Sequence, residues 1–172
     1  MNNFGHVELD HLGDWYKHIE YSLHPDPLSG FNFVDPADAD RYKTDYMCAY
    51  ISRDISDAVQ DFFNKQFGWL THKTYSVQKL KPGMLLPRHT DAYAFFSKTN
   101  NISDLNDITR VIVFLDGWHP GHISEVGNEV NTKCKAGDWV SWVGQTPHMA
   151  ANLGHVDRYT LQITGTTLTK EN

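Results

Sequence analysis

The sequence predicts a mainly β domain, a sandwich or barrel with a helical layer packed against it. From residue 74 onward, short runs rich in β-branched and aromatic residues alternate with Gly and Pro turn signals, and no helical period separates them. Strands spaced in this way form sandwiches or barrels rather than parallel βαβ sheets. The length of 172 residues fits one domain. We expect residues 1–73 to form an N-terminal arm and helical layer, and residues 74–168 to form a jelly-roll core.

The composition excludes several classes of protein. Apolar residues make up 40% and charged residues 21%, which is typical of a folded globular chain. The formal net charge of −6 argues against a nucleic-acid partner, which needs basic surface. No apolar run predicts a signal peptide or a membrane span. Two cysteines, Cys48 and Cys134, cannot form a disulfide framework, so we expect a cytoplasmic protein. The oligomeric state is not predicted.

The N-terminal part divides into an irregular arm and one helix. Three prolines within residues 25–36 exclude a long helix, so we expect short strands and turns there. Apolar residues recur at helical spacing over residues 55–67. Asp54 is the expected N-cap. This helix should place one apolar face on a sheet.

The expected strands follow one another from residue 74. The first two, residues 74–80 and 84–91, are separated by a Pro-Gly turn. The most strand-like segment is 108–118, which has a β-branched centre. Three further strands are expected at 134–144, 147–154 and 158–168. In this interpretation Cys134 begins a strand.

Ten histidines make metal binding a candidate chemistry. A His and a carboxylate two residues apart on a strand project to the same face, and a second His from another strand completes a two-His-one-carboxylate triad. Five such pairs occur: His6/Glu8, His18/Glu20, His24/Asp26, His89/Asp91 and His155/Asp157. Of these pairs, His89/Asp91 closes an extended apolar run after a turn, so we expect it at a strand end facing the barrel interior.

His119 and His122 have the spacing HxxH, but no further ligands lie at the spacing of a structural zinc site. We therefore expect both of them to lie in a loop.

The C-terminal segment TPHMAANLGHVDRYTLQITG contains a candidate for the distal histidine. His148 is the one histidine with a basic residue, Arg158, ten positions later. Thr160 follows on the same strand face, so the guanidinium and the hydroxyl can clamp one carboxylate together.

The order HTD, a long insertion and this segment resembles the double-stranded β-helix core of the Fe(II)/2-oxoglutarate-dependent oxygenases over residues 74–168. LKPGMLLPRHTD is similar to both prolyl hydroxylases and aspartyl/asparaginyl β-hydroxylases, and HMAAN followed by RYTLQ is closer to the second group. The resemblance implies a cupin-like jelly roll, Fe(II) bound by His89, Asp91 and His148, and O₂ as oxidant. It also implies that Arg158 and Thr160 bind the C5 carboxylate of 2-oxoglutarate.

The sequence differs from the patterns of these two hydroxylase groups at several positions. Phe114 stands where prolyl hydroxylases often have a Tyr, and HPGHISE (residues 119–125) replaces their Gly-Gly-x-Thr signature. Some β-hydroxylases lack the acidic ligand, whereas this chain keeps Asp91.

Four further residues have two interpretations each. The resemblance implies that Gln78 bonds the C1 carboxylate of 2-oxoglutarate, the alternative being a solvent-facing strand residue. Asn152 either positions the co-substrate or turns the chain. Arg110 lies among Ile, Val and Phe, so its burial needs an anion, which is either substrate, 2-oxoglutarate or an internal Asp. Tyr93 and the aromatic residues just after it either wall the substrate pocket or belong to the core.

The expected function is that of a dioxygenase hydroxylating an amino-acid or peptidyl side chain, with release of succinate and CO₂. Its partner would be a small molecule or a peptide. The alternative is a cupin-like metal- or sugar-binding module without oxygenase activity. The intact HTD, His148 and Arg158 argue against a degenerate oxygenase that only binds.

Overall fold

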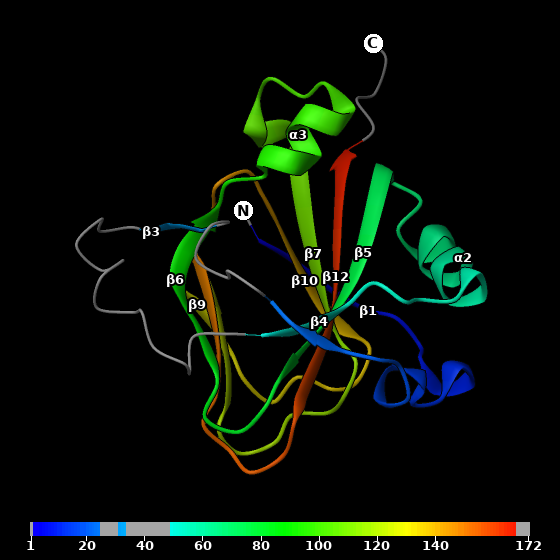
Figure 1. Cartoon of the computed structure of the whole chain (residues 1–172), viewed down its shortest axis with the longest axis vertical. Helices are drawn as coiled ribbons and strands as arrows, with labels where there is room; N and C mark the ends of the chain where they lie inside the picture. The colour runs from blue at the N-terminus through cyan, green and yellow to red at the C-terminus, as the bar shows by residue number, and fades with distance from the viewer. Residues whose placement is uncertain (1, 25–30, 34–48, 168–172) are drawn as a thin grey trace.

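The computed structural model describes residues 2–24, 31–33 and 49–167. Within these residues, two antiparallel sheets face each other, and the helices lie outside the space between them (Figure 1). The seven-stranded sheet has the order β1, β10, β7, β12, β5, β4, β2, with bounds Asn3–His6, Asp138–Val143, Ile108–Phe114, Arg158–Thr167, Leu70–Leu80, Tyr50–Ser52 and Ser22–Leu23. The five-stranded sheet has the order β3, β6, β11, β8, β9, with bounds Phe31–Phe33, Leu85–Asp91, His148–Asn152, His122–Val126 and Glu129–Asn131.

The N-terminal strands form edges of both sheets. β1 pairs with β10, β4 pairs with β5, and β3 pairs with β6. These pairings satisfy backbone groups that an open sheet edge would leave free. The arm expected over residues 1–73 therefore contributes directly to the sheets, and β5 already begins at Leu70.

Two α-helices and three short 3₁₀ helices accompany the sheets in the described residues. Their bounds are Asp57–Gln66 for α2, Ala94–Asn100 for α3, Asp10–Leu12 for η1, Trp15–Lys17 for η2 and Leu105–Asp107 for η4. Among the residues that the structure describes, no helix is both long and apolar enough to cross a membrane.

The helix α2 is shorter than predicted, and Ser56 is its N-cap residue. The expectation that Asp54 caps this helix is wrong. The amide of Ile55 donates to the carbonyl of Arg53 at 3.0 Å, which is a tight turn, and the helix begins only after it.

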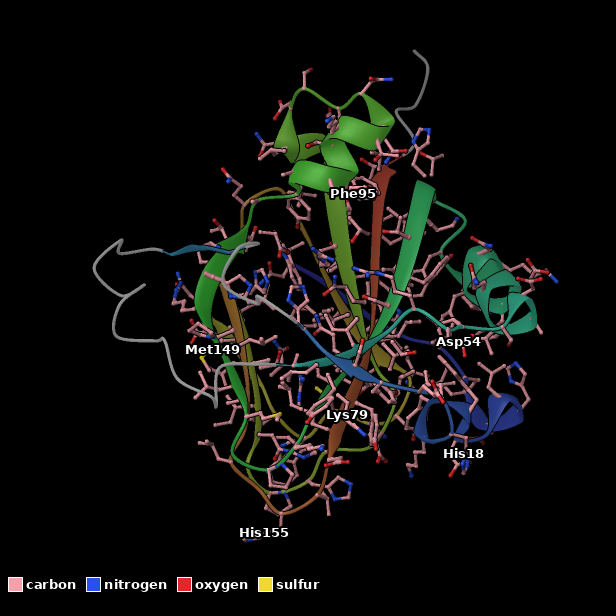
Figure 2. All side chains as sticks on the ribbon, in the orientation of Figure 1. His18, Asp54, Lys79, Phe95, Met149 and His155 are labelled. Atoms are coloured by element: carbon pink, nitrogen blue, oxygen red, sulfur yellow. The ribbon has the colours of Figure 1, made fainter. Side chains whose placement is uncertain are left out.

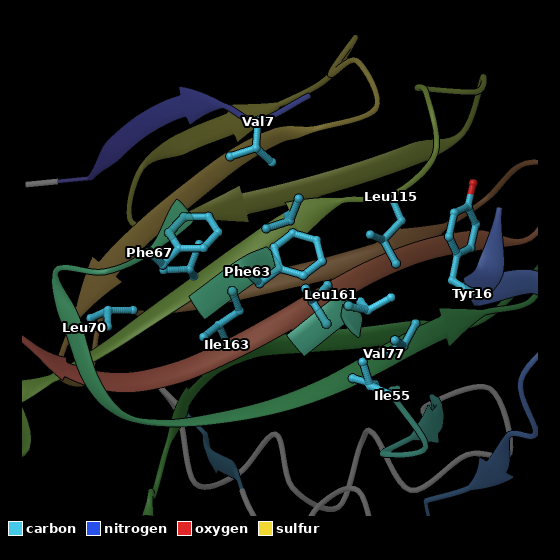
Figure 3. Packing of buried hydrophobic residues seen from close by; sticks show 13 residues of the cluster. Val7, Tyr16, Ile55, Phe63, Phe67, Leu70, Val77, Leu115, Leu161 and Ile163 are labelled. Carbon is cyan, nitrogen blue, oxygen red and sulfur yellow. The ribbon is translucent and has the colours of Figure 1, made fainter. Parts of the chain in front are cut away.

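The largest apolar core lies between α2 and the outer face of the seven-stranded sheet (Figure 3). Phe63 and Phe67, at 0% and 1% exposure, pack with Val77 of β5 and with Leu161 and Ile163 of β12. Since side chains alternate along a strand, the residues between these apolar ones face the space between the two sheets. That inner face is where the candidate site lies.

Two expectations about the central part of the chain are wrong. His122 does not lie in a loop: it begins strand β8, is buried, and pairs through Nε2 with the carbonyl of Val156 at 3.1 Å. Cys134 does not begin a strand. It lies in the connection before β10, half-buried against the cluster of Phe114 and Trp142.

Candidate metal centre

Strands β6 and β11 bring the three predicted ligands together. His89 and Asp91 share one face of β6, and the antiparallel register places His148 of β11 opposite His89. One ligand atom from each of the three side chains lies within 4.8 Å of the others. This set has the composition of a two-His-one-carboxylate site, so it could hold one divalent transition-metal ion.

Two other His-x-acid pairs are not part of this set. His18 is exposed beside η2, and His155 is exposed in the loop between β11 and β12 (Figure 2). Their exposure on the outside of the molecule explains why the spacing alone does not define a site.

The two histidine rings are oriented by backbone carbonyls. Nδ1 of His89 lies 2.6 Å from the carbonyl of Pro87, and Nδ1 of His148 lies 3.0 Å from the carbonyl of Thr146. When Nδ1–H donates in each ring, Nε2 keeps its lone pair, and both Nε2 atoms lie on the side of Asp91. The rings are therefore oriented to present Nε2 to an ion.

Burial keeps both histidines neutral. It lowers the pKa of His89 to about 4, and the repulsion that two protonated rings would experience contributes to this shift. Burial likewise lowers the pKa of His148. Neutral imidazole is the form that binds a metal, so the pair is ready to bind at neutral pH.

Arg110 of β7 holds the carboxylate of Asp91. Its Nη2 donates to Oδ2 of Asp91 at 2.8 Å, and its Nη1 donates to Thr164 at 2.6 Å. Burial acts to raise the pKa of Asp91, but Arg110 and the two histidines outweigh it, so this pKa lies below its ordinary value. Of the anions considered for Arg110, the internal aspartate is the one that contacts it.

The predicted anion-binding residues lie on β12 in the same cavity as the three ligands. This cavity has a volume of about 230 Å³, and Arg158, Thr160 and Gln78 line it together with the triad. Arg158 is 4% exposed. Burial lowers its pKa to about 10, which leaves it charged at neutral pH.

Among the described residues, no carboxylate accepts a hydrogen bond from the Arg158 guanidinium. Its described neighbours are the Phe114 ring, whose centroid lies 5.7 Å away, and the Cys134 thiol. Because a buried cation without an anion is unfavourable, this guanidinium is a candidate for binding an anion.

Gln78 lies beside Thr160 in the pairing of β5 with β12. Its amide nitrogen donates to Oε1 of Gln162 at 2.7 Å, and both amides line the cavity. Gln162 was not among the sequence candidates. The alternation that joins Arg158 to Thr160 also places residue 162 on the same face, and that signal could have found it.

Two other candidates lie outside the cavity lining. Asn152 is fully buried, and its amide donates to the carbonyls of Leu80 and Val156, both at 2.8 Å, as a chain-turning residue would. Tyr93 is buried with its ring 5.1 Å from the Arg110 guanidinium. Of the aromatic residues after it, Phe96 belongs to the cluster of Ile108, and Phe95 is 83% exposed.

No protein-family model matches the chain, and no curated protein does. Among solved structures, it is similar to a prolyl-4-hydroxylase from Pseudomonas putida, with 14% identity, 96% of this chain and 92% of that chain covered, and a TM-score of 0.59. It also matches a predicted oxalate decarboxylase from Thermotoga maritima, with 13% identity, 87% and 95% coverage and a TM-score of 0.48. A cupin domain from Bordetella pertussis matches with 11% identity, 72% and 99% coverage and a TM-score of 0.43.

At these identities the likeness concerns the fold alone. The facing antiparallel sheets and the first of these structures agree on the architecture. The chain therefore has the cupin-like double-stranded β-helix fold, with a His/Asp/His group that could bind a metal ion.

Proposed function

We propose that this protein is an Fe(II)- and 2-oxoglutarate-dependent dioxygenase that hydroxylates an amino-acid or peptidyl side chain, releasing succinate and CO₂. One observation carries the proposal: a two-His-one-carboxylate group and a buried guanidinium, which no carboxylate of the described residues contacts, line the same cavity. A metal site needs the first feature, and a dicarboxylate co-substrate explains the second.

The donor atoms fit iron. Two neutral imidazoles and one carboxylate that leave open positions are typical of non-haem Fe(II) oxygenases. Bound there, the iron would supply the activation of O₂. Our assignment for the chain's own residues is that His89, Asp91 and His148 hold the ion, while Arg110 fixes the orientation of Asp91.

Arg158 and Thr160 are assigned to the C5 carboxylate of 2-oxoglutarate. Both are buried on the inner face of β12, and a guanidinium with a hydroxyl beside it suits one carboxylate. Gln78, next to Thr160 in the sheet, is assigned to the polar part of the same ligand. A cupin-like module that binds a neutral sugar would have no use for a buried unpaired guanidinium in its cavity.

The test is an anaerobic titration of the full chain with Fe(II) and 2-oxoglutarate, following the visible charge-transfer absorption expected of that chelate. Wild type should develop the band, and His148→Ala should not. The matched control is His155→Ala, because His155 belongs to a His-x-Asp pair on the exposed β11–β12 loop.

Arg158→Gln should shift the 2-oxoglutarate concentration needed for the band roughly tenfold to a hundredfold upward, the range for losing a charge-assisted hydrogen bond. Its control is Lys65→Gln, which removes an exposed positive charge on α2. A folded, metal-loaded wild type without any band would reject the oxygenase proposal in favour of a cupin-like binding module.

A further inference from the structure

Among the described residues, two carboxylates line the cavity, and both have a cationic partner. Asp91 is bonded by Arg110 at 2.8 Å, and Glu125 pairs with Arg88 at 3.4 Å. Neither carboxylate is therefore available to neutralise another positive charge in the cavity.

Two arginines that line the cavity have no such partner. Arg158 is the buried one described above, and Arg53, which follows β4, is the other. In the part of the chain that the structure describes, no carboxylate, hydrogen-bond acceptor or aromatic ring contacts the Arg53 guanidinium. The described lining of the cavity thus includes two arginines without an anionic partner, in a protein whose formal net charge is −6.

The backbones of the two arginines lie at different levels of the seven-stranded sheet. Arg158 pairs with Leu80 on β5, and Tyr50 of β4 pairs with Lys79, so the level of Arg158 corresponds to Ala49 on β4. The backbone of Arg53 lies four residues further along, roughly 13 Å by strand geometry, and two strand spacings, about 10 Å, across the sheet. Arg158 is buried, whereas Arg53 is exposed at the rim of the cavity.

The sheet register gives Arg53 a polar path toward the cavity interior. Ser52 pairs with Val77, and extending this register by one residue beyond the strand brings Arg53 beside Ser76. Ser76 in turn pairs with Gln162 of β12. All three residues line the cavity. Together, the side chains of Arg53, Ser76 and Gln162 offer hydrogen-bonding groups from the rim of the cavity inward, along the inner face of the seven-stranded sheet.

We propose that Arg53 is a specificity-determining residue that binds a carboxylate of the substrate at the cavity rim. The inference rests on the proposed function, in which 2-oxoglutarate brings two carboxylates: one is assigned to Arg158 and the other belongs with the metal. Arg53 then remains as a cation for a third carboxylate, which the substrate must carry. The substrate is accordingly a carboxylate-bearing amino acid derivative or an acidic side chain of a peptide.

The experiment compares acid and amide versions of the same probes. One pair is N-acetyl-alanine and its C-terminal amide, and the other is an end-blocked tripeptide with a central Asp and the same peptide with Asn. Binding to the full chain is measured by calorimetry, anaerobically with Fe(II) and 2-oxoglutarate and again in metal-free protein. The variants are Arg53→Gln and the charge-matched control Lys65→Gln.

Wild type should bind the acid of at least one pair roughly tenfold to a hundredfold more tightly than its amide. Arg53→Gln should abolish this preference, and Lys65→Gln should keep it. A preference within the N-acetyl-alanine pair would identify a free α-carboxylate as the group bound. A preference within the tripeptide pair would identify an acidic side chain.

Equal binding of acids and amides by wild type, no binding of either acid, or a preference that survives Arg53→Gln would overturn the proposal. Failure of the proposed function looks different. In that case the charge-transfer band is missing from wild type, while an Arg53-dependent preference for acids can still be present.

Discussion

His89 and His148 connect the candidate metal centre to the stability of the fold. His89 is buried and His148 is partly buried, and burial lowers the pKa of each from 6.5. An unfolded chain therefore binds protons that the folded chain does not, in the range between 6.5 and the folded pKa, which is about 4 for His89. Their contribution to stability is complete above pH 6.5 and is lost as the pH falls below it.

We predict that the metal-free protein loses a few kcal/mol of unfolding free energy as the pH falls from 6.5 toward 4. Urea unfolding at a series of pH values, in the presence of a chelator, measures this loss. His89→Gln should flatten the slope, and His155→Ala should leave it unchanged. An identical slope in wild type and His89→Gln would show that other groups cause the acid sensitivity.

Arg110 illustrates how a residue can be singled out by sequence while its partner cannot. A guanidinium among apolar strand residues needs an anion, and that much follows from the sequence. The partner is Asp91, 19 positions earlier in the chain, because β6 and β7 bring the two side chains together from different sheets. The guanidinium thus holds a candidate metal ligand in place.

At the scale of single elements, β12 shows how one strand can serve the core and the site at once. Leu161 and Ile163 are fully buried in the core beneath α2, and Arg158 and Thr160 alternate with them on the inner face. The sequence of such a strand alternates between apolar and polar residues, and this alternation made the strand predictable.

Strand β8 was not predicted because polar residues occupy two of its three buried positions. Its buried positions are His122, Ser124 and Val126, and Ile123 and Glu125 between them are only half-buried. A strand whose inward side faces a polar cavity lacks the apolar stripe on which sequence interpretation depends.

The packing of α2 makes a quantitative prediction. Phe63 is 0% exposed between the helix and the sheet, so Phe63→Ala should lower the unfolding free energy by about 3–5 kcal/mol. Phe95→Ala is the matched control, because Phe95 is 83% exposed and its loss should change stability by less than about 0.5 kcal/mol. Chemical denaturation of both variants measures the difference. Equal effects would contradict the packing described here.

For the whole molecule, the important feature is that the cavity takes residues from both sheets. The triad belongs to β6 and β11 of the five-stranded sheet, and Arg158 belongs to β12 of the other. A ligand that contacts both sheets binds the folded chain and not the unfolded one, so binding must raise stability.

We expect the thermal unfolding midpoint to rise when Fe(II) is added anaerobically, and to rise again with 2-oxoglutarate. At a hundred times its dissociation constant, each ligand should add about 2.7 kcal/mol. His148→Ala should remove both increments. Arg158→Gln should keep the first and reduce the second. Scanning calorimetry tests this, and a 2-oxoglutarate increment of wild-type size in Arg158→Gln would contradict the role assigned to that residue.

The sequence by itself determined the mainly β class, the one long N-terminal helix, most of the central strands and the residues His89, Asp91, His148, Arg158 and Thr160, which the structure brings to one cavity. These features depend on periodicity and spacing over a few residues, which local sequence carries. The tertiary structure alone decided that the N-terminal strands complete both sheets, that Asp91 is the partner of Arg110, and that Arg53 lines the cavity. Those outcomes depend on register between strands distant in the chain, and no local pattern encodes which distant strand will be the neighbour.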